Sequence, residues 1–243
     1  NFIFYITFAS NRNDFKDSAM LDNLLQKEIF SIVLLGNFNP PIFQPLWFSS
    51  KGLLRESEAE NAQIDVIHPE LARYKIGDWL NVEITKSRCE FRTNMEPYFD
   101  VLRDLVIDTF KILNETPINV VGINNIFDIS LASDEEYYKF GKFLTPLDLW
   151  NRSIHDARLL TLEILEEKSK TCDYLRRRIR ISPGNSNDNI LHGITININN
   201  HFTITEQKKS ELTSIIEKSS KSIRDDSKTI ADNALNDIMN HIR

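Results

Sequence analysis

The fold is decided by two similar stretches, Ser31-Ile32-Val33-Leu34-Leu35-Gly36-Asn37-Phe38 and Asn119-Val120-Val121-Gly122-Ile123-Asn124-Asn125-Ile126-Phe127. Each is an apolar run of strand length rich in β-branched residues, which is typical of a buried strand. Each is followed by a segment that combines proline with tryptophan, at residues 44–47 and 145–150, and later by a helical pattern. We interpret them as the central strands of two related halves.

The remaining pattern predicts antiparallel strands and a covering helix in each half. Residues 79–85 and 88–94 alternate apolar and polar side chains across the two-residue link Lys86-Ser87, which predicts a hairpin. In the first half we expect a further strand at 64–67 and a helix at 97–113. In the second half we expect a helix at 133–143 capped by Ser133, strands at 158–166, 172–182 and 190–199, and a helical stretch at 205–242.

We therefore expect an α+β fold in which two β-(Pro/Trp segment)-βββ-α halves form one curved antiparallel sheet. Both long helices would cover one face of the sheet and leave the other face open. The expected boundaries are an N-terminal extension at 1–28, halves at 29–116 and 117–224, and a C-terminal helix at 225–243. Asp225-Asp226-Ser227 is expected to interrupt or recap the last helical stretch. The alternative is that two ordinary α+β segments share this order by coincidence.

Composition bounds the function. The net charge of −6 argues against wholesale binding of a polyanion, although a local basic face remains compatible with it. The two cysteines, Cys89 and Cys172, match no metal or redox spacing and fit reduced thiols of a cytoplasmic protein. We expect no metal and no cofactor, since the chain has no close Cys/His cluster, Walker A loop, G-x-G-x-x-G loop or nucleophile elbow. No apolar run is long enough for a transmembrane helix.

The apolar stretch at residues 2–8 allows two interpretations. It lacks a basic flank and is a poor signal peptide. Either it is a strand that pairs with the body, or residues 1–19 come from a segment upstream of a start at Met20.

The outward positions of the expected strands are the first candidate site. A face carrying arginine and asparagine can bind an acidic protein partner through bidentate contacts, or phosphates and base edges of nucleic acid. The alternative is a solvated face with cross-strand Arg–Glu pairs. Arg177 falls at an inward-facing position of its strand. The basic cluster formed by Arg176, Arg177, Arg178 and Arg180 is therefore not one continuous surface patch. The partner-binding candidates on this face are Arg88, Arg92, Tyr174, Arg176, Arg178, Arg180, Asn197 and Asn199.

The end of the chain is the second candidate site. Its apolar stripe could lie in the groove of a partner or of a second copy, or pack on its own chain. The stripe residues assigned to partner binding are Leu235, Ile238, Met239 and Ile242.

An enzyme would need a site assembled between the halves. Its candidates are His68, Glu70, His155 and Asp156, and it requires that they converge in space. His192 is expected on the packed face of the last strand, and His201 is expected in a loop after it.

One family resemblance rests on short motifs. Gly122-Ile123-Asn124-Asn125-Ile126 lies in a central strand, and Ile198-Asn199-Asn200-His201-Phe202 ends a late strand. This order resembles a sporadically distributed bacterial family of uncharacterised α+β proteins found near mobile or defence genes. The resemblance covers about residues 29–222. The Pro40-Pro41 break and the extra C-terminal helix depart from it. It implies a bacterial cytoplasmic setting and a protein partner. The family has no established catalytic residues, so none is carried over.

The leading hypothesis is a non-enzymatic binding or accessory subunit that engages another protein or a second copy of itself, with an antiphage or toxin–antitoxin system as one setting. The alternatives are a nucleic-acid-binding protein that uses Arg92 and the arginines at 176, 178 and 180, and an enzyme with a site between the halves.

Overall fold

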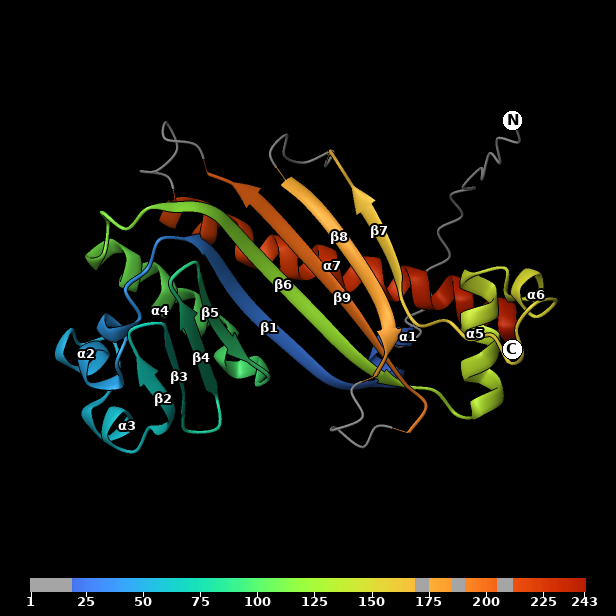
Figure 1. The fold of residues 1–243 in the computed structure, drawn as a ribbon, viewed down its shortest axis with the longest axis horizontal. Helices are drawn as coiled ribbons and strands as arrows, with labels where there is room; N and C mark the ends of the chain where they lie inside the picture. Colours follow the sequence, from blue (N-terminus) through green and yellow to red (C-terminus); the bar gives the residue numbers. More distant parts are fainter. Residues whose placement is uncertain (1–18, 169–174, 185–190, 205–211) are drawn as a thin grey trace.

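The computed structural model of the chain describes residues 19–168, 175–184, 191–204 and 212–243. They form one antiparallel sheet of nine strands in the order β2-β3-β4-β5-β1-β6-β9-β8-β7. The long strands of the sheet are strongly curved, and α4 and α7 lie behind it (Figure 1). The predicted α+β fold, with a curved antiparallel sheet, is confirmed.

The first half contains one long strand, an aromatic connection and four shorter strands. Its elements are α1 (Met20–Leu24), β1 (Leu25–Gly36), η1 (Pro40–Ile42), α2 (Pro45–Ser50), α3 (Glu56–Glu60), β2 (Gln63–His68), β3 (Leu71–Ile76), β4 (Leu80–Thr85), β5 (Arg88–Thr93), η2 (Glu96–Tyr98) and α4 (Phe99–Ile112). The hairpin predicted at Lys86-Ser87 joins β4 to β5. β3 is an additional strand, whose buried residues Ala72, Tyr74 and Ile76 alternate with polar ones.

The second half repeats this order on the other side of the sheet centre. Its elements are β6 (Ile118–Ser130), α5 (Asp134–Leu144), α6 (Leu147–Trp150), β7 (Leu162–Glu166), β8 (Leu175–Pro183), β9 (Gly193–Thr203) and α7 (Leu212–Ile242). From the central pair β1 and β6 outward, β5, β4 and β3 on one side correspond to β9, β8 and β7 on the other. β2 is an extra strand at one edge. Ser133 caps α5 as predicted, because its hydroxyl accepts from the Glu136 N–H at 3.1 Å.

The antiparallel pair β1–β6 joins the two halves. Its register runs from Leu25 opposite Ile129 to Gly36 opposite Ile118, with irregularities near both ends. Gly36 has no room for a side chain, since a Cβ there would lie 2.0 Å from the Pro117 carbonyl oxygen. The close approach of the strand ends therefore depends on this glycine.

The two proline and tryptophan segments differ in burial. Trp47 packs at the edge of the core, with its ring centroid 5.0 Å from that of buried Phe48. Trp150 is 60% exposed, whereas Leu147 is buried and packs near Gly141 of α5. From the sequence we expect each of these segments to plug the core, which is confirmed for Trp47 and wrong for Trp150; in the second segment Leu147 is buried instead.

Two further predictions in the second half are corrected. The strand expected at 158–166 places Leu160 inward, but Leu160 precedes β7 and is 79% exposed. Ile164, which the same strand places inward, does lie on the inward face opposite Ile179, although it is 49% exposed because β7 is an edge strand. His192 does not continue the packed face of β9, because it lies before the strand with a φ of 50°.

Apolar side chains on the helix-covered face form two clusters, of which the first takes residues from both halves and the second mainly from the second half. α7 crosses both of them. It contributes Ile216 and Ile223 to the first cluster, and Leu235 and Met239 to the second. One helix thus packs against both clusters and joins them.

A buried polar layer separates the two clusters beneath the middle of α7. Asn200 Oδ1 accepts from Arg177 Nε at 2.8 Å, and Asn200 Nδ2 donates to Ser227 Oγ at 3.1 Å. The Arg177 guanidinium also pairs with Glu166 at 3.1 Å and with Asp226. Arg177 is buried, as its core-facing parity predicts. Each buried polar group in this layer has a partner, which limits the cost of burying it.

The predicted interruption at Asp225-Asp226-Ser227 is wrong, since α7 is one helix of 31 residues. These residues resemble a cap in composition. In the structure, Asp226 and Ser227 face the polar layer instead, and their side chains contact Arg177 and Asn200. The helix therefore has no reason to end there.

The tail stripe packs on its own chain. Leu235, Ile238 and Met239 are buried in the second cluster, and Ile242 packs against it. These four residues are therefore core residues rather than an exposed partner surface. The stretch at residues 2–8 lies outside the described residues. Among the described helices, none is long and apolar enough to cross a membrane.

We expect Leu235→Ala to lower the free energy of unfolding by about 2–5 kcal/mol, because it removes a fully buried side chain from the second cluster. Leu160→Ala is the matched control, and its exposed side chain predicts a change within about 0.5 kcal/mol. Urea unfolding followed by circular dichroism measures both. Equal effects of the two variants would contradict the packing of α7 on this chain.

Candidate functional site

The open face of the sheet carries a row that takes one residue from each strand. Residues directly opposite in register share a face, so the pairing places this row on one side of the sheet. In sheet order it consists of Gln63, Lys75, Asn81, Arg92, Ser31, Asn124, Asn199, Arg178 and Leu165. We call these nine residues the cross-sheet row. The described helices pack on the opposite face, with the two apolar clusters.

The middle of the cross-sheet row is held by side-chain hydrogen bonds. Asn124 Nδ2 donates to Ser31 Oγ at 3.1 Å, and Asn199 Nδ2 donates to Asn124 Oδ1 at 2.6 Å. Ser31 and Asn124 are 2% and 7% exposed. Side chains of three adjacent strands are thus fixed in one orientation before any ligand arrives.

The arginines of the open face fall into two groups. Arg88 pairs with Glu90 at 2.7 Å, and Arg180 Nε donates to Glu163 at 2.6 Å. Within the described ranges, Arg92, Arg176 and Arg178 have no carboxylate partner. The alternative of a merely solvated face with Arg–Glu pairs describes the first group and not the second.

A groove of about 410 Å³ opens over β7, β8 and β9. Arg176 lies opposite His201, and Arg178 lies opposite Asn199, so these four side chains form two adjacent cross-strand pairs. The other lining residues are Glu163, Ile164 and Leu165. We call it the β8–β9 groove.

The surroundings of His201 disfavour its charged form. Burial lowers its pKa from the ordinary 6.5, and the positive charges of Arg176 and Arg178 lower it further. In its neutral form the imidazole offers one donor and one acceptor.

A second groove, of about 500 Å³, lies over the first half, and its charges are of both signs. Arg73 pairs with Glu83 there at 2.8 Å, and Glu90 is already engaged by Arg88. Its lining includes Asp65 and Asp78 as well as Lys75 and Arg92. Carboxylates therefore balance the cations in this second groove, whereas the two arginines of the β8–β9 groove face one carboxylate, Glu163.

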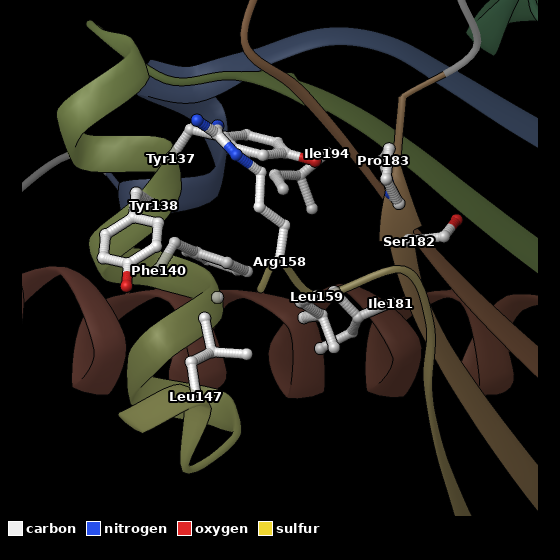
Figure 2. A pocket seen from close by; sticks show the side chains of 11 residues that line it. Tyr137, Tyr138, Phe140, Leu147, Arg158, Leu159, Ile181, Ser182, Pro183 and Ile194 are labelled. Carbon is white, nitrogen blue, oxygen red and sulfur yellow. The ribbon is translucent and has the colours of Figure 1, made fainter. Parts of the chain in front are cut away.

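A third cavity lies between α5 and the ends of β8 and β9. Figure 2 shows its lining, in which Arg158 lies among Tyr137, Tyr138 and Leu159. Its volume is about 10 Å³, which leaves room for one water at most. Arg158 packs over the Tyr138 ring at 6.0 Å and pairs with Asp134 at 3.3 Å. This cavity is therefore a packing feature and not a ligand site.

The predicted partner-binding residues are placed as follows. Arg176, Arg178, Asn197 and Asn199 lie on the open face of β8 and β9, and Arg88 and Arg92 lie on the same face of β5. Arg180 is there too, but it is neutralised by Glu163. Tyr174 lies outside the described residues. Of the tail residues, Leu235, Ile238 and Met239 are buried, and Ile242 packs against the same cluster.

The residues proposed for an enzyme do not converge. The turn carrying His68 and Glu70 and the segment carrying His155 and Asp156 lie at opposite ends of the molecule (Figure 1). Asp156 is instead paired with Arg158 at 3.3 Å. In the ranges that the structure describes, no three His, Cys, Asp or Glu side chains gather as metal ligands.

Three contributors to the open face were not predicted. His201 was placed in a loop, yet β9 extends to Thr203, and His201 continues the alternation of Asn197 and Asn199. Ser31 and Asn124 were assigned only to central strands that hold the sheet together. The alternation of side chains along each strand indicates the face on which all three lie. Which residues lie opposite them depends on the register between distant strands.

Comparison with known proteins adds no identification. No protein-family model matches the chain, and no curated protein matches it.

We expect the pKa of His201, measured by NMR titration, to lie below 6.5 and to rise in both Arg176→Gln and Arg178→Gln. Each substitution removes a positive charge that disfavours the imidazolium ion. Arg92→Gln, on the same row but in the other half, is the control and should leave the pKa unchanged. A pKa that is the same in all four proteins would contradict the described placement of His201.

Proposed function

We propose that this protein is a non-enzymatic binding subunit that engages an acidic surface of another protein through the open face of its sheet. The setting we propose is a bacterial antiphage or toxin–antitoxin system, following the family resemblance. The proposal rests on one observation: Arg92, Arg176 and Arg178 carry charges that no described carboxylate neutralises, on a face that no described helix covers.

Arginine suits this role because its planar guanidinium binds a carboxylate through two parallel hydrogen bonds. The cross-sheet row places Arg92 and Arg178 on either side of the fixed Ser31–Asn124–Asn199 chain. A partner would meet side chains that are already oriented, so less conformational entropy is lost on binding.

A protein partner is favoured over nucleic acid by the carboxylates of the same face. Glu83 and Glu90 lie opposite each other on β4 and β5, Glu163 lies opposite Arg180, and the chain has a net charge of −6. A nucleic-acid backbone presents one sign of charge along its length and would be repelled at these positions. A protein surface can place a cation opposite each glutamate.

The test uses the tagged chain purified from its own host and analysed by native mass spectrometry. We expect a stoichiometric protein component in the wild type and its loss in Arg92→Glu/Arg178→Glu, because charge reversal on the open face repels an acidic partner. The matched control is Lys218→Glu/Lys221→Glu, which changes the charge equally at exposed positions of α7 on the other side of the sheet.

Retention of the component in the control and its loss in the open-face variant would support the proposal. A bound component that nuclease treatment removes would favour the nucleic-acid alternative and overturn the proposal of a protein partner. Equal loss in both variants, or a wild-type monomer with nothing bound, would also overturn it.

A further inference from the structure

The β8–β9 groove contains two positive charges that the described chain leaves uncompensated. Arg176 and Arg178 point to the same side of β8, since they are two residues apart on a strand. Same-face neighbours on one strand are about 7 Å apart, and cross-strand neighbours are about 5 Å apart. The four residues Arg176, Arg178, Asn199 and His201 thus surround an area roughly the size of one small anion.

Arg180, the next arginine on this face of β8, has its positive charge compensated. Glu163 of β7 accepts a hydrogen bond from the Arg180 Nε at 2.6 Å. At the position opposite Arg178, β7 presents Leu165 instead of a carboxylate. Arg180 is thus paired within the sheet, whereas Arg178 has no carboxylate opposite it and lies beside the apolar side chain of Leu165.

The charge and shape of the groove select among anions. One carboxylate would leave one of the two guanidinium groups uncompensated. A phosphate monoester carries about −1.5 to −2 charges at pH 7 and three acceptor oxygens, which match two guanidinium groups. Leu165 lies opposite Arg178 on β7, so β7 presents no carboxylate that would compete with a bound anion for this guanidinium.

We propose that the β8–β9 groove is a binding site for a phosphate monoester, which Arg176 and Arg178 hold together with Asn199 and His201. This site deepens the proposed function and rests on it for the source of the ligand, which would be a phosphorylated side chain of the partner protein. Recognition of such side chains by arginine clusters is a recurrent mode of protein binding.

The test titrates the purified protein with inorganic phosphate and follows the His201 imidazole resonance by NMR. We expect saturable binding in the wild type. Arg176→Gln and Arg178→Gln should each weaken it by about tenfold or more, as expected for the loss of a charge-assisted contact. Circular dichroism of each variant establishes that it is folded.

The glutamate of β7 offers a variant that gains affinity, which misfolding cannot imitate. Glu163→Gln removes a negative charge from the groove and releases Arg180, so phosphate should bind several-fold more tightly. Glu163→Gln/Arg180→Gln removes the same pair with no change in net charge. It should bind within about twofold of the wild type, since an exposed pair contributes little.

Saturable binding that follows this order of variants would support the site. Absence of binding at His201, or equal affinities of all variants, would overturn it. A phosphoserine peptide that binds more tightly than inorganic phosphate, while its serine form does not bind, would support the protein source. Equal affinity for the peptide and for free phosphate would overturn that source. Because these measurements need no partner, failure of the site and failure of the proposed function are distinguishable.

Discussion

The antiparallel pairing of β1 with β6 is the constraint on which the rest of the structure depends. It fixes Ser31 opposite Asn124 and joins the two halves into one sheet. A slip of one residue would turn every side chain of one strand to the other face, which would bury the polar residues and expose the core. The close approach at Gly36, where no side chain fits, helps to select this register. The cross-sheet row is continuous across the two halves because of this pairing.

α7 adds a second constraint because it contacts both apolar clusters. A stripe that was apolar throughout could slide along the sheet, whereas the polar layer of Arg177, Asn200, Asp226 and Ser227 matches in one position only. Breaking such a layer by removing one partner is costly, since the remaining buried groups lose their hydrogen bonds. The polar residues in the middle of α7 thus set the position of the helix, and the apolar residues on either side supply most of the burial.

The two halves share an order of elements and differ in the electrostatics of their open faces. In the first half, Arg73 and Arg88 are matched by Glu83 and Glu90, and Arg92 has no carboxylate partner among the described residues. In the second half, one pair is formed and two arginines remain uncompensated over a groove. Paired charges on an exposed sheet contribute little to stability, and unpaired charges of one sign repel one another. The unpaired arginines have no structural benefit without a ligand, so β8 and β9 are the strands on which we place a binding site.

The sequence by itself determined the α+β class, the hairpin at Lys86-Ser87 and the side of the sheet on which most strand residues lie, including the inward position of Arg177. These features depend on alternation with a period of two, which is local. Only the tertiary structure decided that Arg180 has a glutamate opposite it and Arg178 does not, that His201 belongs to β9, and that the tail stripe is buried. Those outcomes depend on register and packing between segments that are far apart in the chain, and local periodicity carries no information about either.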